Sequence, residues 1–84
     1  MNVINVIKFN CGYSLEYRKI NAGIQPVCLN DKEEKLIPLI LSNKDVSNAV
    51  KLLNDVNEKL ENISFDLFKL IITGALVTVM KYEK

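Results

Sequence analysis

The sequence predicts an α+β fold, in which a small, mostly antiparallel sheet packs against one long amphipathic helix. Three observations lead to this prediction. The N-terminal third is rich in β-branched and aromatic side chains, the middle carries an apolar stripe at helical spacing, and the C-terminal part is β-branched again. No repeat or linker divides the chain, so we expect a single domain over residues 1–84.

Residues 2–9 predict the first strand, because most of them are β-branched and apolar. Ile7 and Phe9 fall on one side of this strand, while Ile4 and Val6 fall on the other. Apolar side chains on both sides are typical of a strand that is covered on both faces. We therefore expect this strand to lie in the centre of the sheet.

A second strand over residues 15–20 completes a hairpin. Residues 10–14 have the composition of a turn, and residues 15–18 alternate between apolar and charged side chains. A short helix, capped by Ser14 and ended by Gly23, is the competing interpretation because the apolar residues also fit a helical spacing.

The next section contains two apolar segments, residues 24–29 and 35–41, on either side of a polar stretch. A hairpin centred on Lys32 would place Pro26 opposite Pro38, where neither residue has an N–H to donate. The alternative for residues 30–37 is a short helical turn that begins at an asparagine cap. The sequence leaves this choice between a turn and a short helix open.

A helix is predicted over residues 43–62. Ser42 is a suitable N-cap, and Asp45 lies three residues later, which is a variant of the capping box. The apolar residues that follow recur at helical spacing and form one stripe: Val46, Ala49, Val50, Leu53, Val56, Leu60 and Ile63.

Residues 65–82 fit two structures. Their many β-branched side chains favour two strands, 65–72 and 76–82, joined through residues 73–75. A second helix capped by Ser64 is the alternative, because Phe68 and Ile72 would then share one face.

The composition argues against an enzyme. The chain has no His, and its two cysteines, Cys11 and Cys28, lack the spacing of a metal or redox motif. No glycine belongs to a phosphate-binding loop. We therefore predict no catalytic residue, no metal site and no cofactor, with both cysteines present as reduced thiols.

The balance between size and hydrophobicity predicts a protein partner, most simply a second copy in a homodimer. Apolar residues make up 49% of only 84 residues, and a small domain has little interior in which to bury them. A net charge of +1 does not favour nucleic acid. The uncharged run over residues 70–80 is shorter than the about 20 residues of a spanning helix, so we expect no membrane association. With no export signal evident, we expect a cytoplasmic protein.

The preferred function is a non-catalytic protein-binding module, such as a phage or viral inhibitor that covers the surface of a host defence factor. The alternative is a binder of single-stranded nucleic acid or nucleotides that uses Tyr13, Tyr17, Arg18 and Lys19, which combine rings for stacking with cations. Asn57 lies at the edge of the helical stripe, where its amide is either solvated or bonds across an interface and fixes its register.

Overall fold

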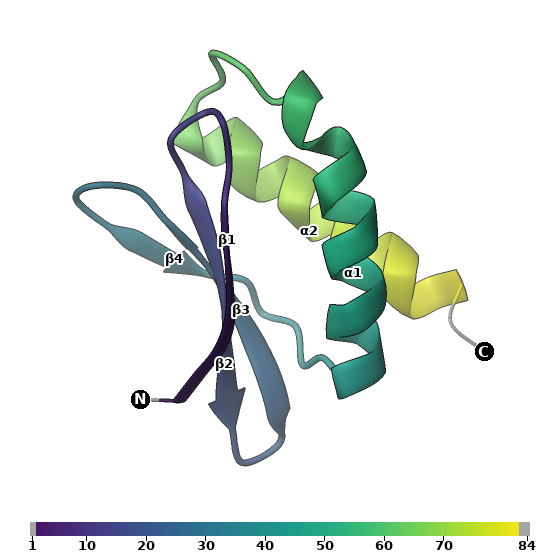
Figure 1. Cartoon of the computed structure of the whole chain (residues 1–84). Helices are drawn as coiled ribbons and strands as arrows, with labels where there is room; N and C mark the ends of the chain where they lie inside the picture. Colours follow the sequence, from purple (N-terminus) through teal and green to yellow (C-terminus); the bar gives the residue numbers. More distant parts are fainter. Residues whose placement is uncertain (1, 83–84) are drawn as a thin grey trace.

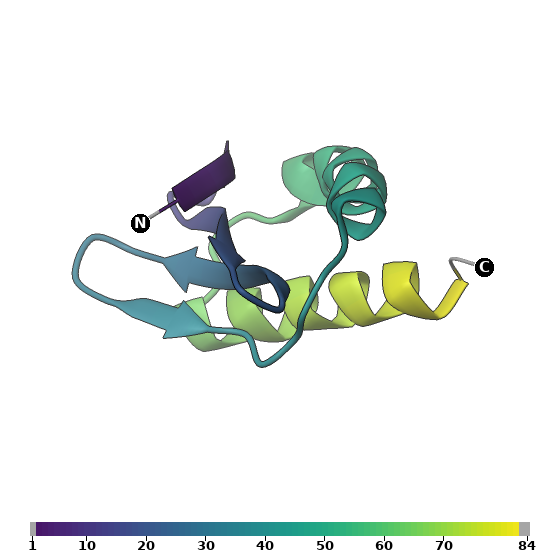
Figure 2. The ribbon, with the colours of Figure 1, turned by 90° about the horizontal axis from the view of Figure 1, so that it is seen from below.

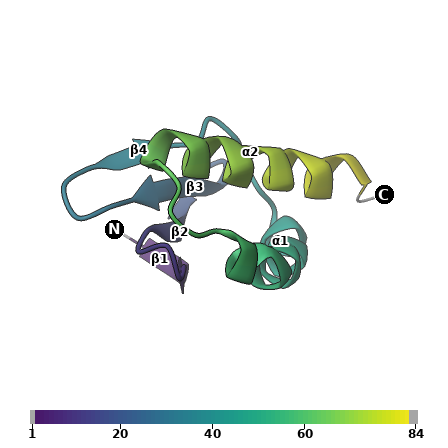
Figure 3. The same cartoon turned by 90° about the horizontal axis from the view of Figure 1, so that it is seen from above.

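The computed structural model describes residues 2–82 and contains a four-stranded antiparallel sheet and two helices, which confirms the α+β class. The strands, labelled in Figure 1, lie side by side in chain order, which the view of Figure 3 shows: β1 (Asn2–Lys8), β2 (Ser14–Ile20), β3 (Gly23–Leu29) and β4 (Glu34–Leu36). The hairpin predicted from residues 2–9 and 15–20 is therefore present, and the competing short helix is not.

The first strand lies at an edge of the sheet. β1 pairs with β2 and with no other strand among residues 2–82, so the prediction of a central strand is wrong. Of its side chains only Ile7 is buried. Apolar side chains on both faces of a strand therefore do not show that both faces are buried, because an edge strand can expose the same side chains to solvent.

A turn, and not a short helix, joins β3 to β4. The side-chain oxygen of Asn30 accepts hydrogen bonds from the backbone N–H groups of Lys32 and Glu33, both at 2.8 Å. An Asn side chain that bonds to the backbone two residues on stabilises a turn. The open choice at residues 30–37 is thus decided in favour of the hairpin.

The register of this hairpin differs from the predicted one by one residue. Ile37 donates its N–H to the carbonyl oxygen of Pro26 at 3.0 Å, and Val27 pairs with Leu36. Pro26 therefore faces Ile37. Pro38 follows the end of β4, so its lack of a backbone N–H costs the sheet no hydrogen bond. The two prolines do not face each other.

The first helix, α1, spans Asn43–Val56 and begins with the predicted capping box. Asp45 donates its backbone N–H to Oγ of Ser42 at 3.0 Å, and its carboxylate accepts the N–H of Ser42 at 2.8 Å. The α-helix ends before residue 62, however, because a 3-10 turn, η1 (Asn57–Lys59), follows it. Asn62 then takes a left-handed backbone conformation, with φ of 52°, which a continuing helix does not allow.

Residues Phe65–Tyr82 form one helix, α2, so the favoured strand pair is wrong and the alternative helix is right. The fold consequently has two helices where one was predicted. Phe68, Ile72 and Leu76 are wholly buried on one face of α2. This burial outweighs the preference of the β-branched residues for strands, which amounts to only about 0.7 kcal/mol or less per residue.

Both helices cover the same face of the sheet (Figures 2 and 3), which we call the inner face. The core lies between the two helices and the inner face of the sheet. It includes side chains from β1, β2, β3, α1 and α2: Ile7, Leu15, Tyr17, Ile24, Cys28, Ala49, Leu53, Phe68, Ile72 and Leu76. No helix within residues 2–82 lies on the opposite, outer face. In that range no helix has the length and apolarity needed to cross a membrane.

Candidate binding surface

The four residues predicted to bind a ligand do not form one surface. Tyr13 and Tyr17 pack into the core beneath the helices, Arg18 lies on the outer face, and Lys19 is exposed near the end of β2. The division follows from the strand itself, since successive side chains of β2 point to opposite faces of the sheet.

Tyr13 connects the first hairpin to the start of α2. Its hydroxyl donates to the carbonyl oxygen of Ile63 at 2.9 Å. Its ring packs against the rings of Phe65 and Phe68, with centroids 5.2 and 5.1 Å away. This ring therefore holds the helix against the sheet and is not presented for stacking on a base.

Tyr17 is completely buried, with 0% of its surface exposed. Its hydroxyl has no hydrogen-bond partner within residues 2–82. Burial raises the pKa of this phenol well above its ordinary value, and the nearby Cys28 adds to the shift. Tyr17 is thus a neutral core residue that carries an unsatisfied polar atom.

Arg18 is held in an ion-pair cluster on the outer face. Its guanidinium donates from Nε to Glu16 at 2.8 Å and from Nη2 to Glu34. The hydrogen bond with Glu34 is the largest cause of the raised Arg18 pKa, and the bond from Arg18 lowers the pKa of Glu34. Arg18 and Glu34 pair with Gln25 and Leu29 of β3, on either side of Val27, which is completely buried.

Asn57 bonds within the chain. Its side-chain oxygen accepts the backbone N–H of Asn10 at 3.0 Å. The bond ties the end of α1 to the turn of the first hairpin, 47 residues earlier in the sequence. The predicted role of Asn57 in an interface with another chain stays a prediction, and the same amide oxygen already has a partner here.

The two cysteines are free thiols. Burial raises the pKa of Cys28 to about 12, so this thiol stays protonated and is a poor nucleophile. Cys11 is half-buried in the turn after β1. Across the part of the chain that the structure describes, no three His, Cys, Asp or Glu residues gather as a metal site would require.

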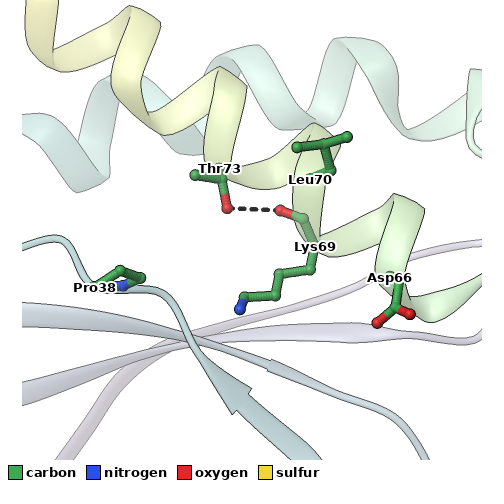
Figure 4. Close-up of a pocket in the computed structure, with 5 residues that line it drawn as sticks. All are labelled: Pro38, Asp66, Lys69, Leu70 and Thr73. Carbon is green, nitrogen blue, oxygen red and sulfur yellow. Dashed lines mark hydrogen bonds between the residues drawn. The ribbon is translucent and has the colours of Figure 1, made fainter.

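The surface of residues 2–82 is hollowed in at least two places. The larger hollow, of about 350 Å³, is lined by Pro38, Asp66, Lys69, Leu70 and Thr73 (Figure 4). Asp66 is paired with Lys35 at 2.6 Å, and the Thr73 hydroxyl donates to the carbonyl oxygen of Lys69 at 2.7 Å. The smaller, of about 260 Å³, is lined by Asn10, Cys11, Glu61 and Asn62. Cys11 and Glu61 both line the smaller hollow, but no hydrogen bond joins them within residues 2–82.

A third feature is the exposed edge of β1. The side chains of Val3, Ile4 and Val6 are 42%, 46% and 46% exposed, and we call these three residues the β1 edge surface. The strand register shifts between Val3 and Asn5, which is a β-bulge. Unpaired strand edges of this length and apolarity are unusual, because they readily pair with another chain.

The register shows which backbone groups of β1 are free. Phe9 donates its N–H to the carbonyl oxygen of Tyr13 at 2.9 Å, which marks a hydrogen-bonded pair. Such pairs alternate along an antiparallel ladder, so Ile7 is also in a bonded pair. The N–H and C=O groups of Val6 and Lys8 consequently point away from β2, toward the free edge.

Sequence reasoning identified the apolar character of residues 2–9 but missed the edge. The available signal was Lys8 together with the two asparagines of β1, since polar side chains on a strand are typical of an edge. The comparisons add no relative: no family model, no curated protein and no solved structure matches this chain.

Proposed function

We propose that this chain is a non-catalytic protein-binding module that binds a strand of another protein chain along β1. The observation that carries this proposal is the β1 edge surface, where apolar side chains lie beside unpaired backbone groups. In strand addition, the backbone hydrogen bonds supply affinity and alternate side chains supply specificity.

The chemistry of the edge supports a protein ligand over a charged one. Lys8 is the only charged residue of β1, while Arg18 is engaged by two carboxylates. An extended apolar segment would satisfy the N–H and C=O groups of Val6 and cover its side chain. A small inhibitor that occludes a host factor, such as a phage or viral protein in the cytoplasm, belongs to this functional class.

The experiment is affinity capture from the native host, followed by mass spectrometry, with three forms of the protein. Val6→Pro removes one outward N–H and obstructs the edge without removing a bond to β2. Leu36→Pro is the matched control, because Leu36 lies on the opposite edge of the sheet, in β4. Circular dichroism establishes that both variants fold.

We expect the wild type and Leu36→Pro to retain a stoichiometric protein partner that folded Val6→Pro loses. Equal recovery of that partner by all three forms would place the binding site elsewhere and overturn the role of β1. Recovery of an oligonucleotide with no stoichiometric protein would overturn the functional class.

A further inference from the structure

We propose that the larger hollow, beside α2, is a binding site for a small carboxylate that carries an apolar group. In this site Lys69 pairs with the carboxylate, and Leu70 and Pro38 contact the apolar group. Asp66, which also lines the hollow, pairs with Lys35 of β4, so the site lies near the edge of the sheet opposite β1. The inference therefore goes beyond the proposed function and does not depend on it.

The ammonium group of Lys69 lacks a partner. Asp66 lies about one turn earlier on α2, close enough for an ion pair along one helix, but it pairs instead with Lys35 at 2.6 Å. Within residues 2–82 the half-buried Lys69 side chain forms neither an ion pair nor a hydrogen bond. Figure 4 shows it extending from α2 toward the segment of Pro38, away from Asp66. An anion in the hollow would supply the missing partner.

The charges around the hollow favour a ligand with a single negative charge. Lys35 and Lys69 carry two positive charges and Asp66 carries one negative charge, which leaves a net charge of +1. A phosphate group carries more charge and is suited to the fork of an arginine or to several cations. Here it would also be repelled by the carboxylate of Asp66. One ammonium group is enough to neutralise a carboxylate.

Lys69 is the one free side-chain donor among the five residues that line the hollow. The Thr73 hydroxyl already donates its proton to the carbonyl oxygen of Lys69 at 2.7 Å, and the other three side chains have no proton to donate at neutral pH. The ligand therefore has one polar anchor, and a second contact must fix its orientation.

The apolar wall of the hollow supplies that second contact. Leu70 has 68% of its surface exposed and lies beside the hollow with Pro38. A ligand that covers Leu70 removes apolar surface from water, which is favourable. The volume of about 350 Å³ is near the lower end of the roughly 300–1,000 Å³ that ligand pockets have, so the ligand is small.

An NMR titration of the whole protein with hexanoate tests the site. We expect saturable shifts of the backbone amides of Lys69, Leu70 and Thr73 at millimolar concentration. Hexanol and hexylamine, which have the apolar chain without the negative charge, should bind much more weakly, and so should acetate, which lacks the chain. Equal affinities for hexanoate and hexanol would overturn the pairing with Lys69. Acetate that binds as tightly as hexanoate would overturn the apolar contact.

Matched variants locate the ligand, and the amide spectrum establishes that each variant folds. Lys69→Met keeps the apolar stem and should weaken hexanoate binding by roughly tenfold, equivalent to about 1.4 kcal/mol, whereas Lys69→Arg keeps the charge and should retain binding. Lys81→Met, near the other end of α2, should change nothing. Leu70→Asn should also weaken binding, but Leu67→Asn, at an exposed leucine outside the hollow, should not. Wild-type affinity in Lys69→Met would overturn the inference.

The carboxylate can belong to a free acid or to the C-terminus of a peptide, and a further titration separates these sources. A tripeptide that ends in leucine is compared with hexanoate and with its own C-terminal amide. Tighter binding of the free peptide than of hexanoate supports a chain terminus, and the reverse order supports a free acid. In both cases the amide should bind more weakly than the free peptide. An amide that binds the hollow as tightly as the free peptide would overturn the role of the carboxylate.

Discussion

The hydroxyl of Tyr13 donates a hydrogen bond to the carbonyl oxygen of Ile63, 50 residues later in the chain. The bond joins the turn after β1 to the segment that leads into α2, so it fixes where the second helix begins to cross the sheet. A second buried tyrosine, Tyr17, has a hydroxyl with no partner within residues 2–82. The substitution of phenylalanine should therefore lower stability at Tyr13 but not at Tyr17.

Tyr13→Phe should lower the free energy of unfolding by about 1 kcal/mol, because it removes the hydrogen bond and leaves the Ile63 carbonyl without that donor. Urea denaturation measures the change. Tyr82→Phe is the control, since Tyr82 is 79% exposed and its hydroxyl is free to bond with water. The control should change stability by less than about 0.5 kcal/mol.

Tyr17→Phe should leave the stability unchanged or raise it by about 1 kcal/mol. The substitution removes a buried hydroxyl whose desolvation is not offset by a bond, while the ring continues to fill the core. The same urea titration measures the difference. A loss as large as that of Tyr13→Phe would contradict this account and would mean that the Tyr17 hydroxyl has a partner.

The contact between Arg18 and Glu34 should make stability depend on pH in the acidic range. The hydrogen bond from Arg18 lowers the folded-state pKa of Glu34 below its ordinary value of 4.5. A carboxylate with a lowered folded pKa contributes stability above its unfolded pKa, and this contribution disappears as the pH falls through the folded pKa.

The wild type should therefore be more stable than Glu34→Gln at neutral pH, and the difference should shrink as the pH falls below about 4.5. The pKa of Asp66 is also lowered, by the hydrogen bond from Lys35. Because the wild type and Glu34→Gln both contain Asp66, the difference between them excludes its effect. In an Arg18→Gln background the pH-dependent difference should largely vanish. Its persistence there would contradict the assigned ion pair.

Two glycines should respond oppositely to alanine. Gly23 has φ of +148°, and a Cβ at this position would lie 2.8 Å from Cγ2 of Ile40 and 2.9 Å from the carbonyl oxygen of Leu41. Gly23→Ala should thus destabilise the protein by about 1–3 kcal/mol. Gly74 lies within α2 with open space around it, so Gly74→Ala should stabilise by about 0.5–1 kcal/mol. Thermal unfolding of the two variants measures both signs.

The sequence predicted the elements whose signals are local. The start of α1 is an example, since Ser42 and Asp45 bond to each other's backbone and need no distant residue. The hairpin between β3 and β4 was one of two alternatives that the sequence left open, and its predicted register differs from the observed one by one residue; Asn30 organises its turn locally. Such contacts can be inferred from spacing alone.

The elements that were missed depend on the tertiary structure. The β-branched residues of α2 favour strands, but Phe68 and Ile72 meet the core only if the segment is helical. Within that helix, Thr73 and Thr78 donate their hydroxyls to backbone carbonyls one turn earlier, which satisfies their polar groups. Similarly, the apolar side chains of residues 2–8 favour a central strand, and only Lys8 and the two asparagines indicate an edge.

The predicted binding residues show the same limit. Tyr17 and Arg18 are neighbours in the sequence, yet alternation along β2 puts the ring in the core and the guanidinium on the opposite face. Whether a tyrosine is available to a ligand depends on what covers its face of the sheet, and for Tyr13 the cover includes Phe68 of α2, a helix that sequence reasoning did not favour.

The order of the elements also determines how the chain is completed during synthesis. All four strands precede both helices, so the ribosome synthesises every strand of the sheet before any residue of α2. Until Phe68, Ile72 and Leu76 emerge, Leu15 and Cys28 have an incomplete cover. The nascent chain therefore passes through an interval in which its apolar face is open to aggregation or to a chaperone, and this interval ends when α2 has emerged and packed against the sheet.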